Sequence, residues 1–291
     1  MSAVVVTGGS GKAGRAVIKE LLDRGHSVIN VDLTAPEERL CHHLKADLTD
    51  LGQAIDALRR AAGTVERRRA FELAHAVVHL AGIPAPGLAP DVTTFQNNLM
   101  STYNVFSAAT LLGVPRVVWA SSETIFGLPF TRVLPAFAPI TEEHPLLPEN
   151  GYALAKKLCE EVAREMHRWN PGTSFVALRI SNIIDPGEYG AFADWQSNPD
   201  LRKWNLWSYV DSRDVAQACR LGIEAPFTGA DEFVIAAHDT VMERPSAELL
   251  AQCFPSVRVT RALARNETLQ SSDKAHRLLG YVPAHSWRTG R

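Results

Sequence analysis

The chain is 291 residues long, which is enough for one large domain or for a large domain with a smaller lobe. Hydrophobic residues make up 46% of the sequence and charged residues 21%, so the disordered, collagen-like and coiled-coil classes of protein are excluded. The formal net charge of −2 leaves no basic field for a nucleic-acid backbone or an anionic membrane surface.

Short β-branched runs alternate with longer helical patterns in the first 180 residues, which is typical of a parallel sheet with crossover helices. The predicted strands are 4–6, 27–32, 43–46, 76–80, 116–120 and 175–179. The predicted helices are 12–24, 51–74, 92–112 and 153–169. These elements predict an α/β fold, a doubly wound parallel sheet of the Rossmann type. We expect residues 1–179 to form the dinucleotide-binding domain and residues 180–291 a smaller substrate lobe, with room for some interleaving with the sheet.

Three glycines follow the first predicted strand and stand immediately before a helix. They are Gly8, Gly11 and Gly14, in a run that reads T-G-G-S-G-K-A-G. In this context glycines allow a tight turn and a close approach of the backbone to a pyrophosphate, which the helix N-terminus attracts. The turn therefore predicts a dinucleotide site. Its expected contacts are Gly8, Gly11, Lys12, Ala13 and Gly14.

Asp32 closes the second predicted strand, 18 residues after Gly14. A carboxylate at this place accepts a hydrogen bond from a ribose 2′-hydroxyl and repels a 2′-phosphate, which favours NAD over NADP. A P-loop of the nucleotide-triphosphate type is excluded, because Val6 stands where its first glycine is required and Ala13 follows Lys12 in place of Ser or Thr.

Tyr152 and Lys156 lie four residues apart at the start of a predicted helix, and therefore on one face of it. A phenol has a pKa near 10, and it becomes a base at neutral pH only where positive charge stabilises its phenolate. Ser122 lies about 30 residues upstream, just after a predicted strand, and such strand ends face the ligand in a doubly wound sheet. Ser122, Tyr152 and Lys156 are therefore the candidate catalytic residues. The interval 127–150 carries five prolines and predicts a long loop that serves this site.

Further motifs follow in order along nearly the whole chain. They are A-D-L at 46–48, H-L-A-G at 79–82, N-L-M-S-T at 98–102, S-S-E-T-I-F-G at 121–127, I-T-E-E-H-P at 140–145, Y-A-L-A-K at 152–156, L-R-I-S-N at 178–182 and V-D-S-R-D-V-A at 210–216. Together with the glycine turn, this set resembles the extended short-chain dehydrogenase/reductases of the NAD-dependent epimerase/dehydratase family.

The resemblance implies NAD as the cofactor and a division of labour in the site. Tyr152 would take a proton from a sugar hydroxyl while a hydride leaves the same carbon. Lys156 would lower the pKa of Tyr152 and bind the nicotinamide ribose, and Ser122 would hydrogen-bond the reacting oxygen. The cofactor contacts that it adds to the glycine turn are Asp32, Asp47, Leu48, Leu80, Ala81, Gly82, Asn98, Tyr152 and Lys156. The substrate contacts that it implies are Ser122, Glu123, Thr124, Asn182, Asp211 and Arg213.

The reaction that follows hydride removal is narrowed by two features. Dehydratases of the family carry T-D-E where Ser122, Glu123 and Thr124 stand, so a second carboxylate is missing and dehydration is disfavoured. The segment 180–291 has only 112 residues, which is short for a nucleotide-sugar member and resembles the uronate dehydrogenases. We expect an oxidoreductase acting on a sugar or sugar acid. The alternatives are a nucleotide-sugar 4-epimerase with retained NAD, and a non-catalytic dinucleotide-binding sensor or scaffold, although proteins of that last kind typically lose the Tyr–Lys pair.

The remaining expectations concern the surroundings of the protein. The resemblance implies a homodimer formed through the helices predicted over 92–112 and 153–169. The four cysteines form no C-x-x-C, and the start of the chain is typical of neither a signal peptide nor an anchor. We therefore expect a cytoplasmic protein with no metal, nucleic-acid or membrane partner. Trp195, Trp204 and Trp207 stay open between core packing and stacking on a sugar.

Overall fold

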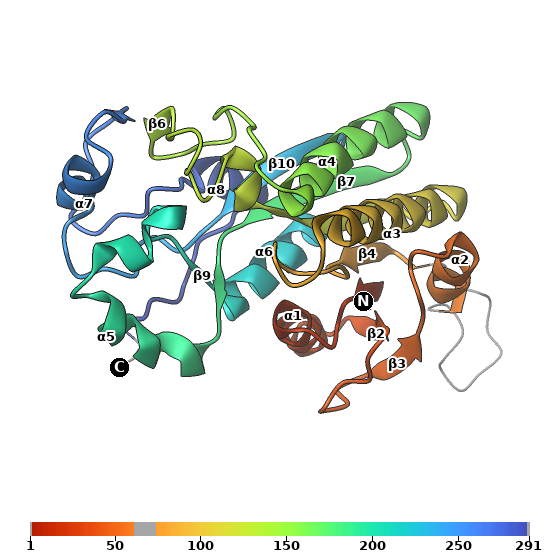
Figure 1. Cartoon of the computed structure of the whole chain (residues 1–291). Coiled ribbons are helices and arrows are strands. Elements are labelled where there is room, and N and C mark those ends of the chain that lie inside the picture. The colour runs from red at the N-terminus through yellow and green to blue at the C-terminus, as the bar shows by residue number, and fades with distance from the viewer. Residues whose placement is uncertain (1, 61–73, 290–291) are drawn as a thin grey trace.

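The computed structural model describes residues 2–60 and 74–289. Its centre is a parallel sheet of seven strands in the order β10-β7-β5-β4-β1-β2-β3 (Figure 1). The strands are β1 Ala3–Thr7, β2 Ser27–Asp32, β3 His42–Lys45, β4 Ala76–His79, β5 Arg116–Ser122, β7 Ser174–Ile180 and β10 Ala230–Ile235. The predicted doubly wound α/β fold is confirmed. The strand order reverses between β1 and β4, and ligands of such sheets bind at that point.

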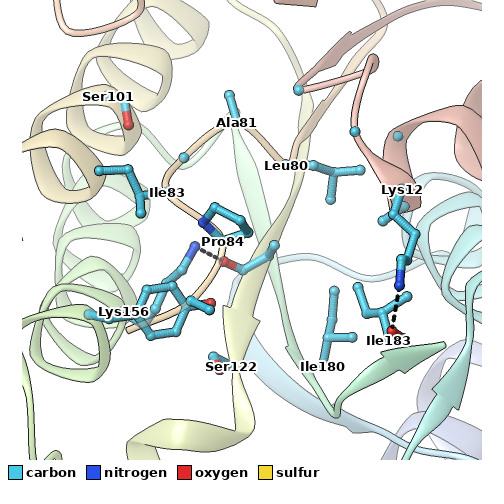
Figure 2. A pocket seen from close by; sticks show the side chains of 18 of the residues that line it. Lys12, Leu80, Ala81, Ile83, Pro84, Ser101, Ser122, Lys156, Ile180 and Ile183 are labelled. Atoms are coloured by element: carbon cyan, nitrogen blue, oxygen red, sulfur yellow. Dashed lines mark hydrogen bonds between the residues drawn. The ribbon is translucent and has the colours of Figure 1, made fainter. Parts of the chain in front are cut away.

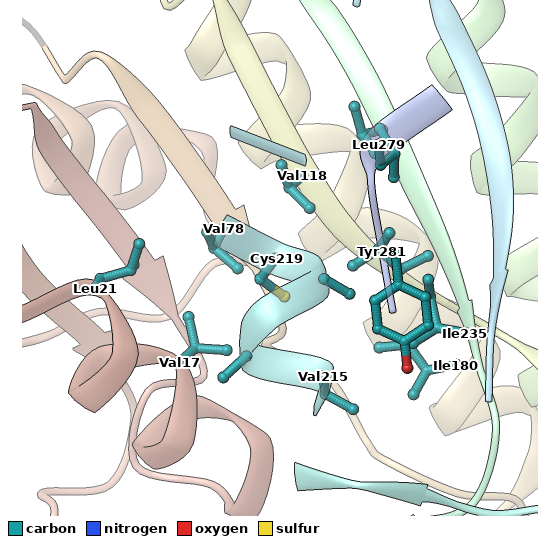
Figure 3. Packing of buried hydrophobic residues seen from close by; sticks show 14 of the residues in the cluster. Val17, Leu21, Val78, Val118, Ile180, Val215, Cys219, Ile235, Leu279 and Tyr281 are labelled. Atoms are coloured by element: carbon teal, nitrogen blue, oxygen red, sulfur yellow. The ribbon is translucent and has the colours of Figure 1, made fainter. Parts of the chain in front are cut away.

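Helices cover both faces of the sheet because its strands are apolar on both sides. The helices on one face are α1 Lys12–Asp23, α6 Ser212–Glu224 and α8 Asp273–Leu279, whose side chains meet those of the strands in Figure 3. The helices on the other face are α2 Leu51–Arg60, α3 Asp91–Leu111 and α4 Gly151–Trp169. In β1, Val4 and Val6 belong to the first cluster and Val5 to the second, as the alternation of side chains along a strand requires. In the described part of the chain, no helix is both long and apolar enough to span a membrane.

A third apolar cluster forms the core of a lobe beside the sheet, with the buried indoles of Trp207 and Trp287 at its centre. Short elements build this lobe. They are η1 Glu123–Phe126, β6 Phe137–Ala138, β8 Ile183–Ile184, η2 Pro186–Ala191, α5 Phe192–Trp195, η3 Pro199–Leu201, η4 Lys203–Asn205, β9 Val210–Asp211, α7 Ser246–Cys253 and β11 Arg258–Val259. β6 pairs with β11, and β8 pairs with β9.

The segment after residue 180 is interleaved with the sheet. It supplies the edge strand β10 and the helices α6 and α8, while the core of the lobe takes residues 125–140 from the first half of the chain. The division into 1–179 and 180–291 stays a prediction. Of the helix predicted over 51–74, residues 51–60 are helical and 61–73 lie outside the described residues.

Candidate active site

A cavity of about 1070 Å³ lies at the carboxyl ends of β1, β4, β5 and β7, where the strand order reverses (Figure 2). Its volume is at the upper end of the roughly 300–1,000 Å³ that ligand pockets usually span, so it suits a large ligand. With three exceptions, every residue predicted for the site lines this cavity. The exceptions are Asn98, Asp211 and Arg213.

The glycine turn forms a cradle in which the neighbouring backbone leaves no room for a Cβ at Gly8 or Gly14. Gly8 has a φ of +71°, and a Cβ there would lie 2.6 Å from the backbone nitrogen of Ala81. A Cβ on Gly14 would lie 2.2 Å from the carbonyl oxygen of Gly8. Gly11 caps α1 without a side chain, so the N–H groups of the first helical turn are open to a ligand. The cradle therefore fits a pyrophosphate.

The carboxylate of Asp32 is arranged to receive a ribose. It accepts hydrogen bonds from the backbone nitrogens of Ser10 at 3.1 Å and Thr34 at 3.0 Å. A carboxylate has about four acceptor positions, so two remain for hydroxyl groups. The residues at this end of the cavity thus fit a dinucleotide.

Two further predicted contacts, Asp47 and Leu48, line the same end of the cavity. Hydrogen bonds from Thr49 lower the pKa of Asp47. The side-chain amide of Asn104 donates to the carbonyl oxygens of Leu48 at 3.0 Å and Thr49 at 2.8 Å, which fixes the loop after β3.

Lys12 lines the cavity, but its ammonium group is shared with the lobe. It donates to the carbonyl oxygen of Ile183 at 3.4 Å, as Figure 2 shows, and lies 2.6 Å from a carboxylate oxygen of Glu188. The first turn of α1 is therefore joined to the segment 183–188 across the cavity.

A buried histidine supports the wall formed by Leu80, Ala81 and Gly82. The Nδ1 of His79 lies 2.7 Å from the hydroxyl of Thr7, and its Nε2 lies 3.1 Å from the hydroxyl of Thr102. Burial lowers the pKa of His79 to about 3, and the charge of Lys156 adds to the effect. His79 is therefore a neutral structural link between β1, β4 and α3.

Asn98 does not line the cavity, and its contact with the cofactor stays a prediction. Its Oδ1 accepts from the backbone nitrogen of Ile83 at 2.8 Å, and its Nδ2 donates to the carbonyl oxygen of Ile83 at 2.9 Å. Both ends of the amide are thus used on one backbone residue, and Asn98 holds the loop 80–86 against α3.

Ser122, Tyr152 and Lys156 converge on the cavity from β5 and α4. Tyr152 is the second residue of α4, which begins earlier than predicted because the Asn150 side chain accepts from the backbone nitrogen of Ala153 at 2.9 Å. Lys156 donates to the carbonyl oxygen of Ala120 at 2.6 Å, and its ammonium nitrogen lies 5.7 Å from the centre of the Tyr152 ring.

Burial controls the pKa of the phenol in the protein alone. It raises the pKa of Tyr152 to about 12, against a hydrogen bond with Ser122, and the charge of Glu123 raises it further. Burial also lowers the pKa of Lys156. The pKa of Tyr152 in this structure is thus set by burial, Ser122 and Glu123, and its lowering by Lys156 stays a prediction.

A buried ion pair fixes α4 against the strand that carries Ser122. Arg179 of β7 donates to both carboxylate oxygens of Glu160, at 2.9 and 2.8 Å, and the hydroxyl of Ser121 donates to the same carboxylate at 2.7 Å. The exposed fraction of both charged side chains is 2% or less. The pair links α4, β5 and β7 directly behind the catalytic candidates.

The substrate residues predicted as Glu123, Thr124 and Asn182 line the end of the cavity nearest the lobe. Thr124 donates from its hydroxyl to Ser122 at 3.0 Å. Asn182 accepts at its Oδ1 from Arg202 at 2.9 Å.

The three tryptophans considered for core packing or for stacking on a sugar have different positions. Trp204 lines the cavity, whereas Trp207 is fully buried and donates from its indole to the carbonyl oxygen of Pro199 at 2.8 Å. Trp195 stacks on Phe192 with ring centres 4.9 Å apart. Only Trp204, of these three, is therefore placed to stack on a sugar.

Asp211 and Arg213 do not line the cavity, and their contact with the substrate stays a prediction. The carboxylate of Asp211 is the N-cap of α6 and accepts from the backbone nitrogen of Arg213 at 2.8 Å. It also accepts from the Arg213 guanidinium and from the hydroxyl of Tyr189. Both residues thus anchor the segment η2 to α6.

Several cavity residues were missed by reasoning from the sequence. Leu128, Pro129 and Asn150 come from the proline-rich interval, whose prolines did signal a loop at the site. Ile83 to Pro86 and Asn97 line the opposite wall without any motif that marks them.

Comparison with known proteins gives a consistent result. A model of the NAD dependent epimerase/dehydratase family matches residues 4–236. UDP-glucose 4-epimerase of Bacillus subtilis is 33% identical over 228 residues, which are 76% of this chain and 63% of that protein. The chain thus spans less than two thirds of the length of this curated relative.

Two solved structures resemble nearly the whole chain. A short-chain dehydrogenase/reductase superfamily protein from Agrobacterium tumefaciens with bound NAD has a TM-score of 0.71 and 23% identity, over 99% of this chain and 94% of that one. A mutated uronate dehydrogenase has a TM-score of 0.67 and 21% identity, over 98% and 82%. At these identities the likeness shows the fold.

Proposed function

The chain belongs to the NAD-dependent epimerase/dehydratase family, with NAD as its cofactor, and from this premise we propose that it oxidises a hydroxyl group of a sugar or sugar acid. One observation carries the proposal. Ser122, Tyr152 and Lys156 open into the same cavity as the glycine cradle, so the glycine turn would hold the pyrophosphate of a dinucleotide while Tyr152 would meet a substrate hydroxyl in the same cavity.

The proposed oxidation consists of a proton transfer and a hydride transfer. NAD, when bound, supplies a hydride acceptor and a positive charge at this end of the cavity. The Oη of Tyr152 takes the proton of the substrate hydroxyl, and the Oγ of Ser122 hydrogen-bonds the same oxygen. Loss of this proton, and of the hydride from the carbon that bears it, leaves a carbonyl group. The carbonyl oxygen of Ala120 holds the ammonium group of Lys156 near the phenolate that forms.

The charges that line the cavity favour a substrate without phosphate groups. Among the described lining residues the cations are Lys12, Arg15 and Lys156, and they border the cradle and the nicotinamide end. A nucleotide sugar carries a pyrophosphate, for which proteins usually provide arginine or lysine. We therefore rank the oxidation of a sugar or sugar acid above 4-epimerisation of a nucleotide sugar, the activity that the Bacillus subtilis relative's name states.

Replacement of Tyr152 by Phe tests the mechanism. We expect NAD to bind Tyr152→Phe with unchanged affinity in calorimetry, because the ring stays in place. We expect turnover to fall by orders of magnitude, since the proton acceptor is lost. Turnover is measured as NADH absorbance with a panel of free sugars, sugar acids and nucleotide sugars.

The outcomes separate the candidate functions. Net NADH with a free sugar or sugar acid supports the proposal, whereas conversion of a nucleotide sugar without net NADH supports the epimerase. Unchanged turnover in Tyr152→Phe would contradict the mechanism. NAD binding without turnover of any sugar in the wild-type protein would support the sensor or scaffold.

A further inference from the structure

One carboxyl group lies at the substrate end of the cavity, directly after Ser122. Glu123 lines the cavity, and only 3% of it is exposed. Its Oε2 accepts from the hydroxyl of Ser181 at 2.8 Å and from the side-chain amide of Gln270. Its Oε1 accepts from the side-chain amide of Asn205 at 3.3 Å. All of these donors are neutral, so hydrogen bonds hold the carboxylate without cancelling its charge.

The cation that attracts Glu123 forms its hydrogen bond with another side chain. Arg202 attracts Glu123, but its guanidinium donates to the Oδ1 of Asn182 at 2.9 Å. The rings of Trp195 and Trp204 lie 4.5 and 5.1 Å from its central carbon and cover its flat faces. Arg202 is not among the lining residues. The charge that the lobe end of the cavity presents to a ligand is therefore that of Glu123.

The protonation of Glu123 is balanced near neutrality. Burial raises the pKa of Glu123 to about 7, against hydrogen bonds from Ser181, Gln270 and Asn205 and the attraction of Arg202. The charge of Glu123 acts in turn on Arg202 and Tyr152, and it raises the pKa of both groups. Above neutrality the carboxylate is ionised, and its charge acts in a cavity from which a substrate displaces water.

We propose that Glu123 is a specificity-determining residue that makes the cavity select an uncharged, hydroxyl-rich sugar and reject a sugar acid. This inference rests on the proposed function and narrows its substrate class. A second carboxylate at this end would lose hydration and meet a like charge without a cation to pair with. The hydroxyl groups of a neutral sugar can donate hydrogen bonds to the carboxylate, and the apolar face of the sugar can stack on Trp204.

Glu123→Gln is a variant that the surroundings can accommodate. The Oδ1 of Asn205 and the Oε1 of Gln270 are buried and have no hydrogen-bond partner among the residues that the structure describes. Rotation of either carboxamide exchanges its nitrogen and oxygen, so the new amide group of Gln finds an acceptor. The matched control is Glu248→Gln, which removes the same charge from an exposed position in the first turn of α7.

The experiment compares pairs of sugars that differ only in a terminal CH₂OH or carboxylate group. We expect kcat/KM of the wild-type protein to favour the neutral sugar by at least about tenfold at pH 8. In Glu123→Gln this ratio falls by about tenfold, and in Glu248→Gln it is unchanged. The ratio in the wild type also falls from pH 8 to pH 6, because Glu123 gains its proton while the sugar carboxylate stays ionised. Effects of pH on Tyr152 cancel in the ratio.

Calorimetric binding of both sugars to the NAD-loaded protein separates this inference from the proposed function. Selective binding of the neutral sugar without turnover would support the inference and contradict the proposed function. Turnover with a preference for the sugar acid, or with a ratio that Glu123→Gln leaves unchanged, would overturn the inference and leave the proposed function intact. A failure of both sugars of every pair to bind would overturn both.

Discussion

To act as the base of the proposed reaction, Tyr152 would need a positive charge from outside the protein. Its burial raises the pKa to about 12, so almost no phenolate exists at neutral pH in the protein alone. The same burial excludes water, which strengthens the effect of any positive charge brought into the cavity. In the proposed mechanism, the phenol would therefore lose its proton readily only when a cationic ring is bound next to it.

We predict that the carboxylate of Asp32 sets the choice between the two nicotinamide dinucleotides. We expect Asp32→Asn to weaken NAD binding by about 10- to 100-fold, because a hydrogen bond to a charged group contributes about 1.5–3 kcal/mol. Binding of NADP weakens less or improves, since the repulsion of its 2′-phosphate is removed. Titration calorimetry of both dinucleotides measures the ratio. A ratio equal to that of the wild type would show that Asp32 does not contact the ribose.

At the scale of residues, the sequence predicts the members of the site better than their partners. Gly14 and Tyr152 stand in local patterns whose geometry follows from strand–turn–helix order and helical spacing. Asn98 lies outside the cavity lining, and the group that satisfies its amide, the backbone of Ile83, is 15 residues away in the sequence. Nothing local distinguishes a polar side chain aimed at a ligand from one satisfied by the fold.

At the scale of elements, α4 carries the catalytic candidates and depends on Glu160 for its position. We expect Glu160→Gln to lower the free energy of unfolding by about 3–5 kcal/mol, because it leaves the buried guanidinium of Arg179 without its counter-charge. The matched control is Glu161→Gln. Glu161 is 63% exposed and pairs with Arg164, so we expect a change within about 0.5 kcal/mol. Urea denaturation measures both variants, and similar losses in the two would contradict the role given to Glu160.

The sequence predicts a strand well when its residues are apolar along the whole strand or at every second position. The six predicted strands have continuous or alternating apolar runs. The first half of the missed strand β10 contains Asp231 and Glu232, whose carboxylates pair with Lys274 of α8 and Arg164 of α4. Its polar half is typical of a loop in the sequence, because the residues that pair with these carboxylates are remote in the chain. The short elements of the lobe are set by tertiary contacts of the same kind, which a local pattern does not contain.

At the scale of the whole molecule, α3 and α4 present an apolar surface side by side (Figure 1). Met100 and Tyr103 of α3 are 44% and 40% exposed, and Leu154 and Leu158 of α4 are 40% and 38% exposed. Spacings of three and four residues place each pair on one helical face. An apolar surface of this kind is typical of an interface, and the same surface on two copies satisfies a two-fold axis.

We therefore predict a homodimer formed by α3 and α4 of each copy, with a mass of twice 31.9 kDa in light scattering at micromolar concentration. Leu158→Glu places a charge in the predicted interface, where it loses hydration without a partner, and we expect this variant to be monomeric. Leu278→Glu is the control, because Leu278 is 49% exposed on α8, away from this surface, and its variant stays dimeric. A monomeric wild-type protein would contradict the predicted dimer. Dissociation of both variants alike would contradict the predicted position of its interface. Since Tyr152 and Lys156 lie on α4 as well, a monomeric variant that keeps its turnover would further show that each copy holds a complete site.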